Sequence, residues 1–264
     1  MIGQEKLKKH IASLDMDTFP RSIILLGLRG SGKKHFINHF IQPKLNISII
    51  DITQNISQET ISEIYMKPEP SIYLVDIREI SIKEQNILLK LVEEPLKNAY
   101  IIFIGTYRGN FLSTILNRCQ IWELEVYTEN QLKYFCEENF YYILEYCKTP
   151  GDVIQYTNIP IEIINSIIDI CDKMIQYIST AAFSNTLTIS DRISYSKKEG
   201  DKKWDYLLFC NILQTRIISA IKNNPNKRLF DFYYTTSKLL QDNAIAHINF
   251  PHLFENYLYH IKNL

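Results

Sequence analysis

Glycine is scarce in this chain, yet three of its eight glycines, Gly27, Gly30 and Gly32, fall within six residues of one another. Lys33 follows at once, so that the segment has the pattern G-x-x-x-x-G-K at the end of the apolar run SIILLG. Glycines let backbone N–H groups turn toward phosphate oxygens, and a following helix terminus and lysine add positive charge. This spacing, after an apolar run and before a stretch of helical periodicity, predicts a phosphate-binding loop, or P-loop.

Short runs rich in β-branched residues alternate with helical stretches in the first half of the chain. The predicted strands are 22–27, 47–52, 71–77, 100–106 and 119–125, and the predicted helices lie at about 33–42, 57–66, 82–94 and 110–117. The strand segments are almost continuously apolar, as expected for strands that are covered on both faces. The alternation therefore predicts an α/β fold with a five-stranded parallel sheet.

The pattern changes after residue 126, where no further strand is predicted. Helices are expected at about 128–148, 152–158, 161–183, 204–223, 227–247 and 251–263, and a polar loop, whose role the sequence leaves open, at 184–203. Pro150 and Gly151 are expected to separate the first two of these helices. The chain is thus predicted to form an α/β domain at 1–126, a small helical domain at 127–159 and a helical C-terminal domain at 160–264.

Composition excludes several classes of protein. The 29 Lys and Arg residues equal the 29 Asp and Glu residues, so the chain lacks the basic excess of a free-standing DNA-coating protein. Its 5 cysteines form no C-x-x-C pair, which argues against a disulfide framework and a zinc ribbon and favours a reducing, cytoplasmic location. The N-terminal segment lacks the apolar core of a secretory signal, and no apolar run is long enough to span a membrane.

The predicted nucleotide site departs from that of an active ATPase in two places. Lys34 stands where a Ser or Thr hydroxyl would hold Mg²⁺, and its positive charge would repel the metal. Asp76 ends the third strand, where a P-loop NTPase has its magnesium-side carboxylate. The next residue, where a glutamate would polarise the attacking water, is Ile77, and Glu79 lies too far along the chain to replace it. Mg²⁺-assisted hydrolysis is therefore disfavoured, while binding of ATP or ADP stays open.

Several segments resemble the clamp-loader subunits of the AAA+ family. The segment QNILLKLVEEP at 85–95 resembles the family's N-x-LLK-x-(L/V)EEP helix, and LSTILNRCQ at 112–120 is similar to its L-x-TI-x-SRCQ segment. The opening IGQEKLKKHI resembles the family's N-terminus, and IIFIGT ends in Thr106, where the family has its sensor-1 polar residue. Pro150-Gly151-Asp152 resembles the lid segment that carries a sensor-2 arginine in active members, but no arginine stands there.

Within that family, the missing hydroxyl, the missing glutamate and the retained Arg-Cys pair most resemble the catalytically silent delta-prime type of bacterial DNA polymerase III. The resemblance implies an AAA+ core, a helical lid and a helical collar. It also implies assembly with other clamp-loader subunits into a hetero-pentamer that loads a sliding clamp onto primed DNA, with no membrane involved. Residues 53–70 contain no cysteine, so the zinc module of many family members is not expected.

The resemblance also implies roles for individual residues. The candidate nucleotide-binding residues are Gly27, Gly30, Gly32, Lys33, Lys34, Asp76 and Thr106. Arg118, in Asn117-Arg118-Cys119, matches the family's arginine finger, which reaches the γ-phosphate of ATP bound to a neighbouring subunit. The plainer interpretation of Arg118 is a surface arginine that stabilises the end of the helix at 110–117.

Two other functions remain open. Lys33 and Asp76 favour a divergent AAA+ ATPase that hydrolyses ATP itself, as a motor subunit or a helicase loader, whereas Lys34 and Ile77 oppose it. A small-molecule P-loop kinase would leave the LLKLVEEP and NRCQ segments without a role.

Overall fold

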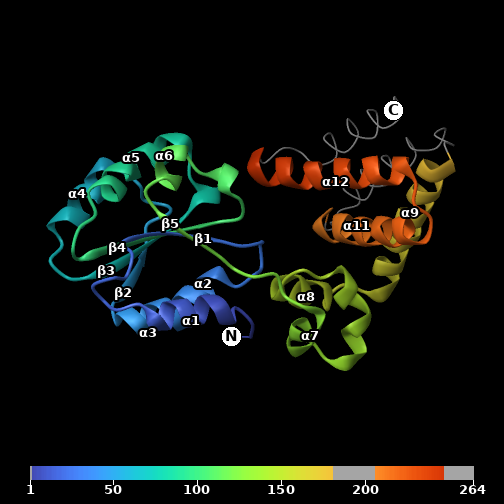
Figure 1. The fold of residues 1–264 in the computed structure, drawn as a ribbon, viewed down its shortest axis with the longest axis horizontal. Helices are drawn as coiled ribbons and strands as arrows, with labels where there is room; N and C mark the ends of the chain where they lie inside the picture. The colour runs from blue at the N-terminus through green and yellow to red at the C-terminus, as the bar shows by residue number, and fades with distance from the viewer. Residues whose placement is uncertain (1, 181–205, 247–264) are drawn as a thin grey trace. The chain divides into compact units, whose positions relative to one another are not determined.

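The computed structural model describes residues 2–180 and 206–246 (Figure 1). The chain divides into two compact units. The first contains the residues up to Gln131 together with Thr149–Gly151, and the second contains Leu132–Lys148 and the chain from Asp152 onward. The division into three domains stays a prediction. The loop expected at 184–203 and the helix expected at 251–263 lie outside the described residues.

The first unit is built on a parallel sheet with the strand order β2-β3-β4-β1-β5. The strands are β1 (Ser22–Leu26), β2 (Ser48–Asp51), β3 (Ser71–Asp76), β4 (Ala99–Gly105) and β5 (Gln120–Glu123). All five predicted strands are confirmed, with ends that differ by a residue or two. Since β1 lies between β4 and β5, the chain order reverses beside β1, and ligands of such sheets bind at the carboxyl edge near that reversal.

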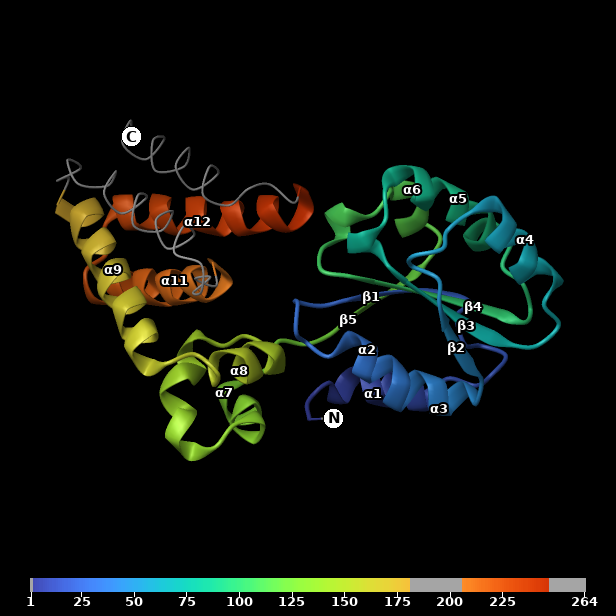
Figure 2. The ribbon, with the colours of Figure 1, turned by 180° about the vertical axis from the view of Figure 1, so that it is seen from behind.

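Helices cover both faces of the sheet, as Figures 1 and 2 show from opposite sides. One face carries α1 (Glu5–Ser13), α2 (Lys33–Phe36), the π-helical turn Ile37–Ile41 and α3 (Gln42–Leu45); the other carries α4 (Gln58–Met66), α5 (Ile82–Glu93) and α6 (Ser113–Leu116). Successive strand residues alternate between the faces. In β4, Ile102 packs with the first group of helices and Phe103 with the second, and both are fully buried. This two-sided burial explains the apolar runs of the inner strands β1, β3 and β4, whereas the edge strands β2 and β5 keep exposed positions.

Two predicted helices of this unit differ in detail. In place of the regular helix expected at 33–42, the structure has three consecutive helical segments, which are α2, the π-helical turn and α3. Pro43 lies in the first turn of α3 and has no N–H to donate to the preceding turn, which accounts for the irregular hydrogen bonding there. The helix expected at 110–117 is the single turn α6, preceded by the 3-10 turn Arg108–Asn110.

A buried side chain of α5 positions the segment that leads into α6. The Nε2 of Gln85 donates to the carbonyl of Asn110 at 3.1 Å, and its Oε1 accepts from the N–H of Leu112 at 2.9 Å. Gln85 is almost fully buried, and these two backbone groups provide partners for both polar atoms of its side chain. The segment that carries Arg118 is thereby fixed to α5.

The second unit is helical, but not as predicted near its start. The short helix α7 (Glu129–Leu132) leads into it. Its elements include the 3-10 turns Lys133–Phe135 and Glu138–Tyr146 and the helices α9 (Ile161–Thr180), α11 (Tyr206–Asn223) and α12 (Lys227–Ala246). Helix α8 (Pro150–Tyr156) begins in the first unit's segment Thr149–Gly151 and continues in the second unit. The expected continuous helix at 128–148 is wrong, because Cys136 and its neighbour Glu137 adopt extended backbone and interrupt it. The segment Glu138–Tyr146 forms 3-10 turns instead of an α-helix, and in this geometry it buries Ile143, Leu144 and Tyr146.

The later helices of this unit are confirmed within the described residues. Pro150 opens α8 instead of separating two helices, as suits a residue without an N–H in a first turn. Arg216 of α11 forms a two-pronged ion pair with Asp172 of α9 at 2.7 and 2.6 Å, and Asn211 donates to the Tyr156 hydroxyl at 3.1 Å. Across residues 2–180 and 206–246, no helix combines the length and the apolar character that crossing a membrane requires.

The role of Gln85 can be tested by truncation. Gln85→Ala removes the hydrogen-bond partners of the partly buried Asn110 carbonyl and Leu112 N–H, so the free energy of unfolding of the first unit should fall by about 1–3 kcal/mol. The exposed neighbour Asn86 is the matched control, and Asn86→Ala should change it by less than about 0.5 kcal/mol. Urea unfolding followed by Trp122 fluorescence, in a Trp204→Phe background, measures both. Equal effects of the two substitutions would contradict the assignment.

Candidate functional site

The P-loop follows β1 and adopts the conformation that its glycines permit. Gly30 and Gly32 have φ angles of +79° and +83°, in the left-handed region that other residues avoid. A Cβ at Gly30 would lie 2.6 Å from Thr149 Oγ1 and 3.0 Å from Gly151 Cα, so only glycine fits there. The N–H of Gly151 donates to the Gly30 carbonyl at 3.0 Å. The P-loop is thus packed against the segment Thr149–Gly151 of its own unit.

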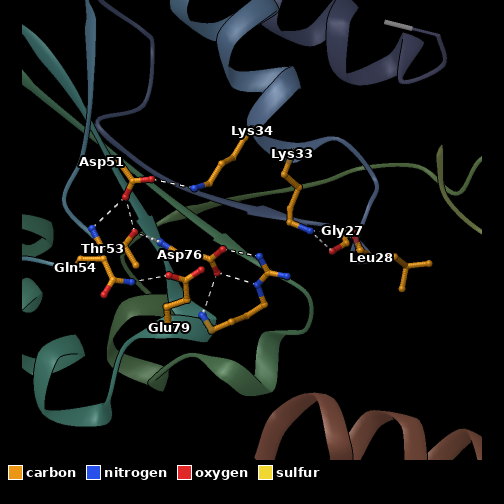
Figure 3. A network of polar contacts seen from close by, with 10 residues as sticks. Gly27, Leu28, Lys33, Lys34, Asp51, Thr53, Gln54, Asp76 and Glu79 are labelled. Atoms are coloured by element: carbon orange, nitrogen blue, oxygen red, sulfur yellow. Dashed lines mark hydrogen bonds and ion pairs between the residues drawn. The ribbon is translucent and has the colours of Figure 1, made fainter. Parts of the chain in front are cut away.

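Lys33 is folded back onto the P-loop (Figure 3). Its Nζ donates to the carbonyls of Gly27 at 2.6 Å and Leu28 at 2.9 Å, and the residue is 6% exposed. Burial is the main cause that lowers the pKa of this lysine to about 8, and the positive charge of Arg78 lowers it further. The ammonium group that should bind phosphate is therefore engaged with carbonyls of its own loop.

Lys34 and Asp76 are connected by a chain of polar contacts through two residues that sequence reasoning missed (Figure 3). The Nζ of Lys34 pairs with Asp51 Oδ2 at 2.9 Å, at the end of β2. Asp51 Oδ1 accepts from the Thr53 hydroxyl at 2.6 Å, and that hydroxyl oxygen accepts from the N–H of Asp76 at 2.9 Å. Lys34 is thus turned toward β2 by an ion pair.

The carboxylate of Asp76 is occupied by Arg78. Oδ1 accepts from the Nε of Arg78 at 2.8 Å and from its backbone N–H at 3.2 Å, and Oδ2 accepts from Nη2 at 2.5 Å. Asp76 is 1% exposed. Burial acts to raise the pKa of Asp76, but the hydrogen bonds and charge of Arg78 outweigh it and hold this pKa below its ordinary value. Asp76 is therefore a buried carboxylate whose counter-ion is a guanidinium group.

Neither Ile77, at the position of an ATPase's water-activating glutamate, nor the nearby Glu79 is placed to take that role. Ile77 is buried in the core against α4, α5 and α6. Glu79 accepts from Gln54 Nε2 at 2.7 Å. Thr106 lies directly beyond β4 and is half-buried. It shares the carboxyl edge of the sheet with Asp76, because Asp76 of β3 is paired with Ile104 of β4.

Arg118 lies toward the opposite edge of the sheet. It follows α6 and precedes β5, whose first residue Gln120 is in register with Ile23 near the start of β1. Its Nη1 donates to the Thr114 carbonyl at 3.0 Å, and its Nη2 pairs with Glu93 Oε1 at 3.1 Å. The Arg118 side chain is 41% exposed. The structure thus brings the P-loop residues, Asp76 and Thr106 to one edge, and leaves Arg118 apart from them.

Part of the chain is similar to subunits of a DNA polymerase. A family model described as “DNA polymerase III, delta subunit” matches residues 39–128, which include Asp76, Thr106 and Arg118. The DNA polymerase III subunit delta' of Haemophilus influenzae is 28% identical over 80 residues, which make up 30% of this chain and 24% of that protein. The match therefore spans about a quarter of that relative's length. Within the matched region, the chain is similar to subunits of the DNA polymerase III clamp loader.

Solved structures show the same fold. Two variants of RuvB from Thermotoga maritima have a TM-score of 0.50 to this chain, with 19% and 18% sequence identity, over 98% of this chain and 88% of each variant. This likeness supports the α/β fold with a parallel sheet that the sequence predicts. At such identity it shows the fold only.

The magnesium nucleotide of active AAA+ proteins does not fit the residues of this one. Mg²⁺ requires oxygen ligands in near-octahedral geometry, at the positions that Lys34 and Asp76 hold here. The first is an ammonium group in an ion pair, and both oxygens of the second accept from Arg78. Among the residues that the structure describes, no group of three or more His, Cys, Asp or Glu side chains could hold a metal ion.

Of the residues that sequence reasoning missed, Arg78 had a visible signal. An aspartate that ends a buried strand and is followed two residues later by arginine, as in Asp76-Ile77-Arg78, can form an ion pair within a single turn. Asp51 and Thr53 carry no comparable signal, since their contacts with Lys34 and Asp76 depend on the pairing of β2 with β3.

The lowered pKa of Lys33 predicts a pH-dependent stability. Since the folded pKa of about 8 lies below the ordinary 10.5, the unfolded chain binds more protons between these values, and stability should rise with pH there. Relative to that of Lys33→Met, the free energy of unfolding of the wild-type chain should rise by about 3 kcal/mol between pH 8 and 10.5. Below pH 7 the difference between the two should not change with pH.

Urea unfolding at a series of pH values, followed by Trp122 fluorescence with Trp204 replaced by phenylalanine, measures this difference. Lys34→Met is the matched control, because it removes the exposed lysine that is next in sequence. Its free energy of unfolding should rise with pH as steeply as that of the wild-type chain. A constant difference between Lys33→Met and wild type from pH 7 to 10.5 would contradict the prediction.

Proposed function

We propose that this chain is a delta-prime-like clamp-loader subunit. It assembles with other clamp-loader subunits into a hetero-pentamer in the cytoplasm and helps to load a sliding clamp onto primed DNA. It does not hydrolyse ATP itself but supplies Arg118 to the ATP site of a neighbouring subunit. The observation that carries the proposal is the contrast between a half-exposed Arg118 and a P-loop site filled by the chain's own side chains.

The position of Arg118 favours action on a neighbour. Because the residue precedes β5, it lies away from the carboxyl edge where Lys33 and Asp76 meet, so it does not serve the chain's own P-loop. An arginine finger stabilises the charge that develops on the phosphoryl group during transfer. Its contacts with Glu93 and the Thr114 carbonyl hold the guanidinium at the end of α6, where part of it remains open to solvent.

The chemistry of the P-loop site favours a silent subunit. Hydrolysis requires a metal ion on the phosphates and a group that orients the attacking water. Here Arg78 occupies the metal-side carboxylate, and Ile77 stands buried where the water-orienting glutamate would be. The relatives of the matched region support a role beside other subunits of a DNA polymerase III.

A second function remains in view, a divergent AAA+ ATPase that works as a motor subunit or a helicase loader. It is favoured by the presence of Lys33 and Asp76 at the edge where they would serve catalysis. Turnover of MgATP by the isolated chain would support it, and absence of turnover supports the silent subunit.

Arg118→Ala tests the finger directly. The partners are first recovered with the tagged chain and a non-hydrolysable ATP analogue; a P-loop ATPase with an intact GK[ST] and a sliding clamp are expected among them. In the reconstituted assembly, with the other ATP sites inactivated, Arg118→Ala should lower turnover at the neighbouring site on the order of a thousandfold.

Arg108 provides a matched control, since it is also an exposed arginine in an ion pair, with Glu123 at 2.8 Å. Arg108→Ala should leave turnover unchanged, and neither variant should lower the melting temperature of the isolated chain by more than a few degrees. Unchanged turnover with Arg118→Ala would overturn the proposed function.

A further inference from the structure

We propose that Arg78 is a built-in cation that takes the place of the divalent metal and closes this chain's own P-loop site to magnesium nucleotide. The inference rests on the proposed function and identifies Arg78 as the residue that keeps the subunit from using ATP at its own P-loop. It concerns only the carboxyl edge of the sheet and is independent of Arg118.

The first support is the geometry of the pair. Asp76 caps the single 3-10 turn Ile77–Glu79, and this turn brings both the backbone N–H and the side chain of Arg78 onto its carboxylate. The guanidinium engages both oxygens in a two-pronged contact, the strongest form of such pairing. Only Ile77 separates the partners, so the contact forms within one turn and closes a very short loop.

The second support is burial. The Asp76 side chain is 2% exposed and that of Arg78 is 28% exposed. A carboxylate this deeply buried requires a compensating charge, and a bound metal ion would normally provide it. Here the compensating charge belongs to the chain itself. A metal ion could bind Asp76 only after Arg78 had left, and it would then meet the positive charges of Lys33 and Lys34 on the other side of the site.

The third support comes from Lys34, which holds the position of the other metal ligand. Lys34 replaces the hydroxyl ligand, and its ion pair with Asp51 is linked through the Thr53 hydroxyl to the backbone of Asp76. Both positions that would hold the metal are thus occupied by protein contacts of one continuous network (Figure 3). Arg78 is the member whose removal frees the Asp76 carboxylate.

Binding of a fluorescent ATP analogue to the isolated full-length chain, with Mg²⁺ and with EDTA, tests the proposal. The wild-type chain should show no gain in affinity from Mg²⁺. Arg78→Ala should show a Mg²⁺-dependent gain of about tenfold or more, because the carboxylate becomes accessible to the metal. Arg78→Ala combined with Asp76→Asn should lose that gain, and the control Arg108→Ala should behave as wild type.

Asp76→Asn in the otherwise wild-type chain guards against misfolding of Arg78→Ala, because asparagine keeps hydrogen-bonding atoms beside Arg78. It should leave nucleotide binding unchanged in the presence of Mg²⁺. A Mg²⁺-dependent gain in the wild-type chain, weakened by Asp76→Asn, would overturn the proposal, as would a folded Arg78→Ala without any gain. Since Arg118→Ala tests the neighbour's site, failure of the Arg78 inference and failure of the proposed function can be told apart.

Discussion

The parallel register of β1, β3 and β4 is the constraint on which the rest of the site depends. It pairs Leu26 with Gly105 and Asp76 with Ile104, so that the segments after these strands meet at one edge of the sheet. The same parallel pairing of β1 with β5 sends Arg118 toward the opposite edge. The P-loop follows β1, whereas Arg118 precedes β5. Because the two strands are parallel, the chain's own P-loop and the residue proposed to act on a neighbour lie at opposite edges of the sheet.

Within that frame, the buried carboxylate of Asp76 decides the chemistry. A buried, uncompensated carboxylate destabilises a fold by several kcal/mol, so some positive charge must accompany it. A metal ion would make the stability of this edge depend on a ligand. Arg78 makes the compensation part of the chain, and the burial of Lys33 against the carbonyls of Gly27 and Leu28 has the same effect on the P-loop. The ammonium group of Lys33 and the carboxylate of Asp76 thus both have partners within the chain itself.

The sequence predicted the parts of this arrangement that depend on local pattern. Continuous apolar runs predicted all five strands, and the glycine spacing predicted the P-loop, since both reflect constraints on neighbouring residues. Other predictions failed. The prediction of one continuous helix at 128–148 is wrong because Cys136 and Glu137 have extended backbone, although no glycine or proline marks a break there, and α1 was not predicted. The ion pair of Lys34 with Asp51 could not be predicted, because it joins residues of different elements through strand pairing.

Arg78 and Arg118 show how burial assigns opposite roles to one residue type. Both are paired with a carboxylate of the same chain, at 2.5 Å and 3.1 Å. The pair of Arg118 with Glu93 is about 40% exposed on each side, and such pairs contribute about 0–1 kcal/mol, so exchanging Glu93 for another anion costs little. Breaking the pair of Arg78 with the buried Asp76 leaves an uncompensated charge and costs about 3–5 kcal/mol. An arginine held weakly at the surface can serve a partner, whereas one held at a buried carboxylate serves only its own fold.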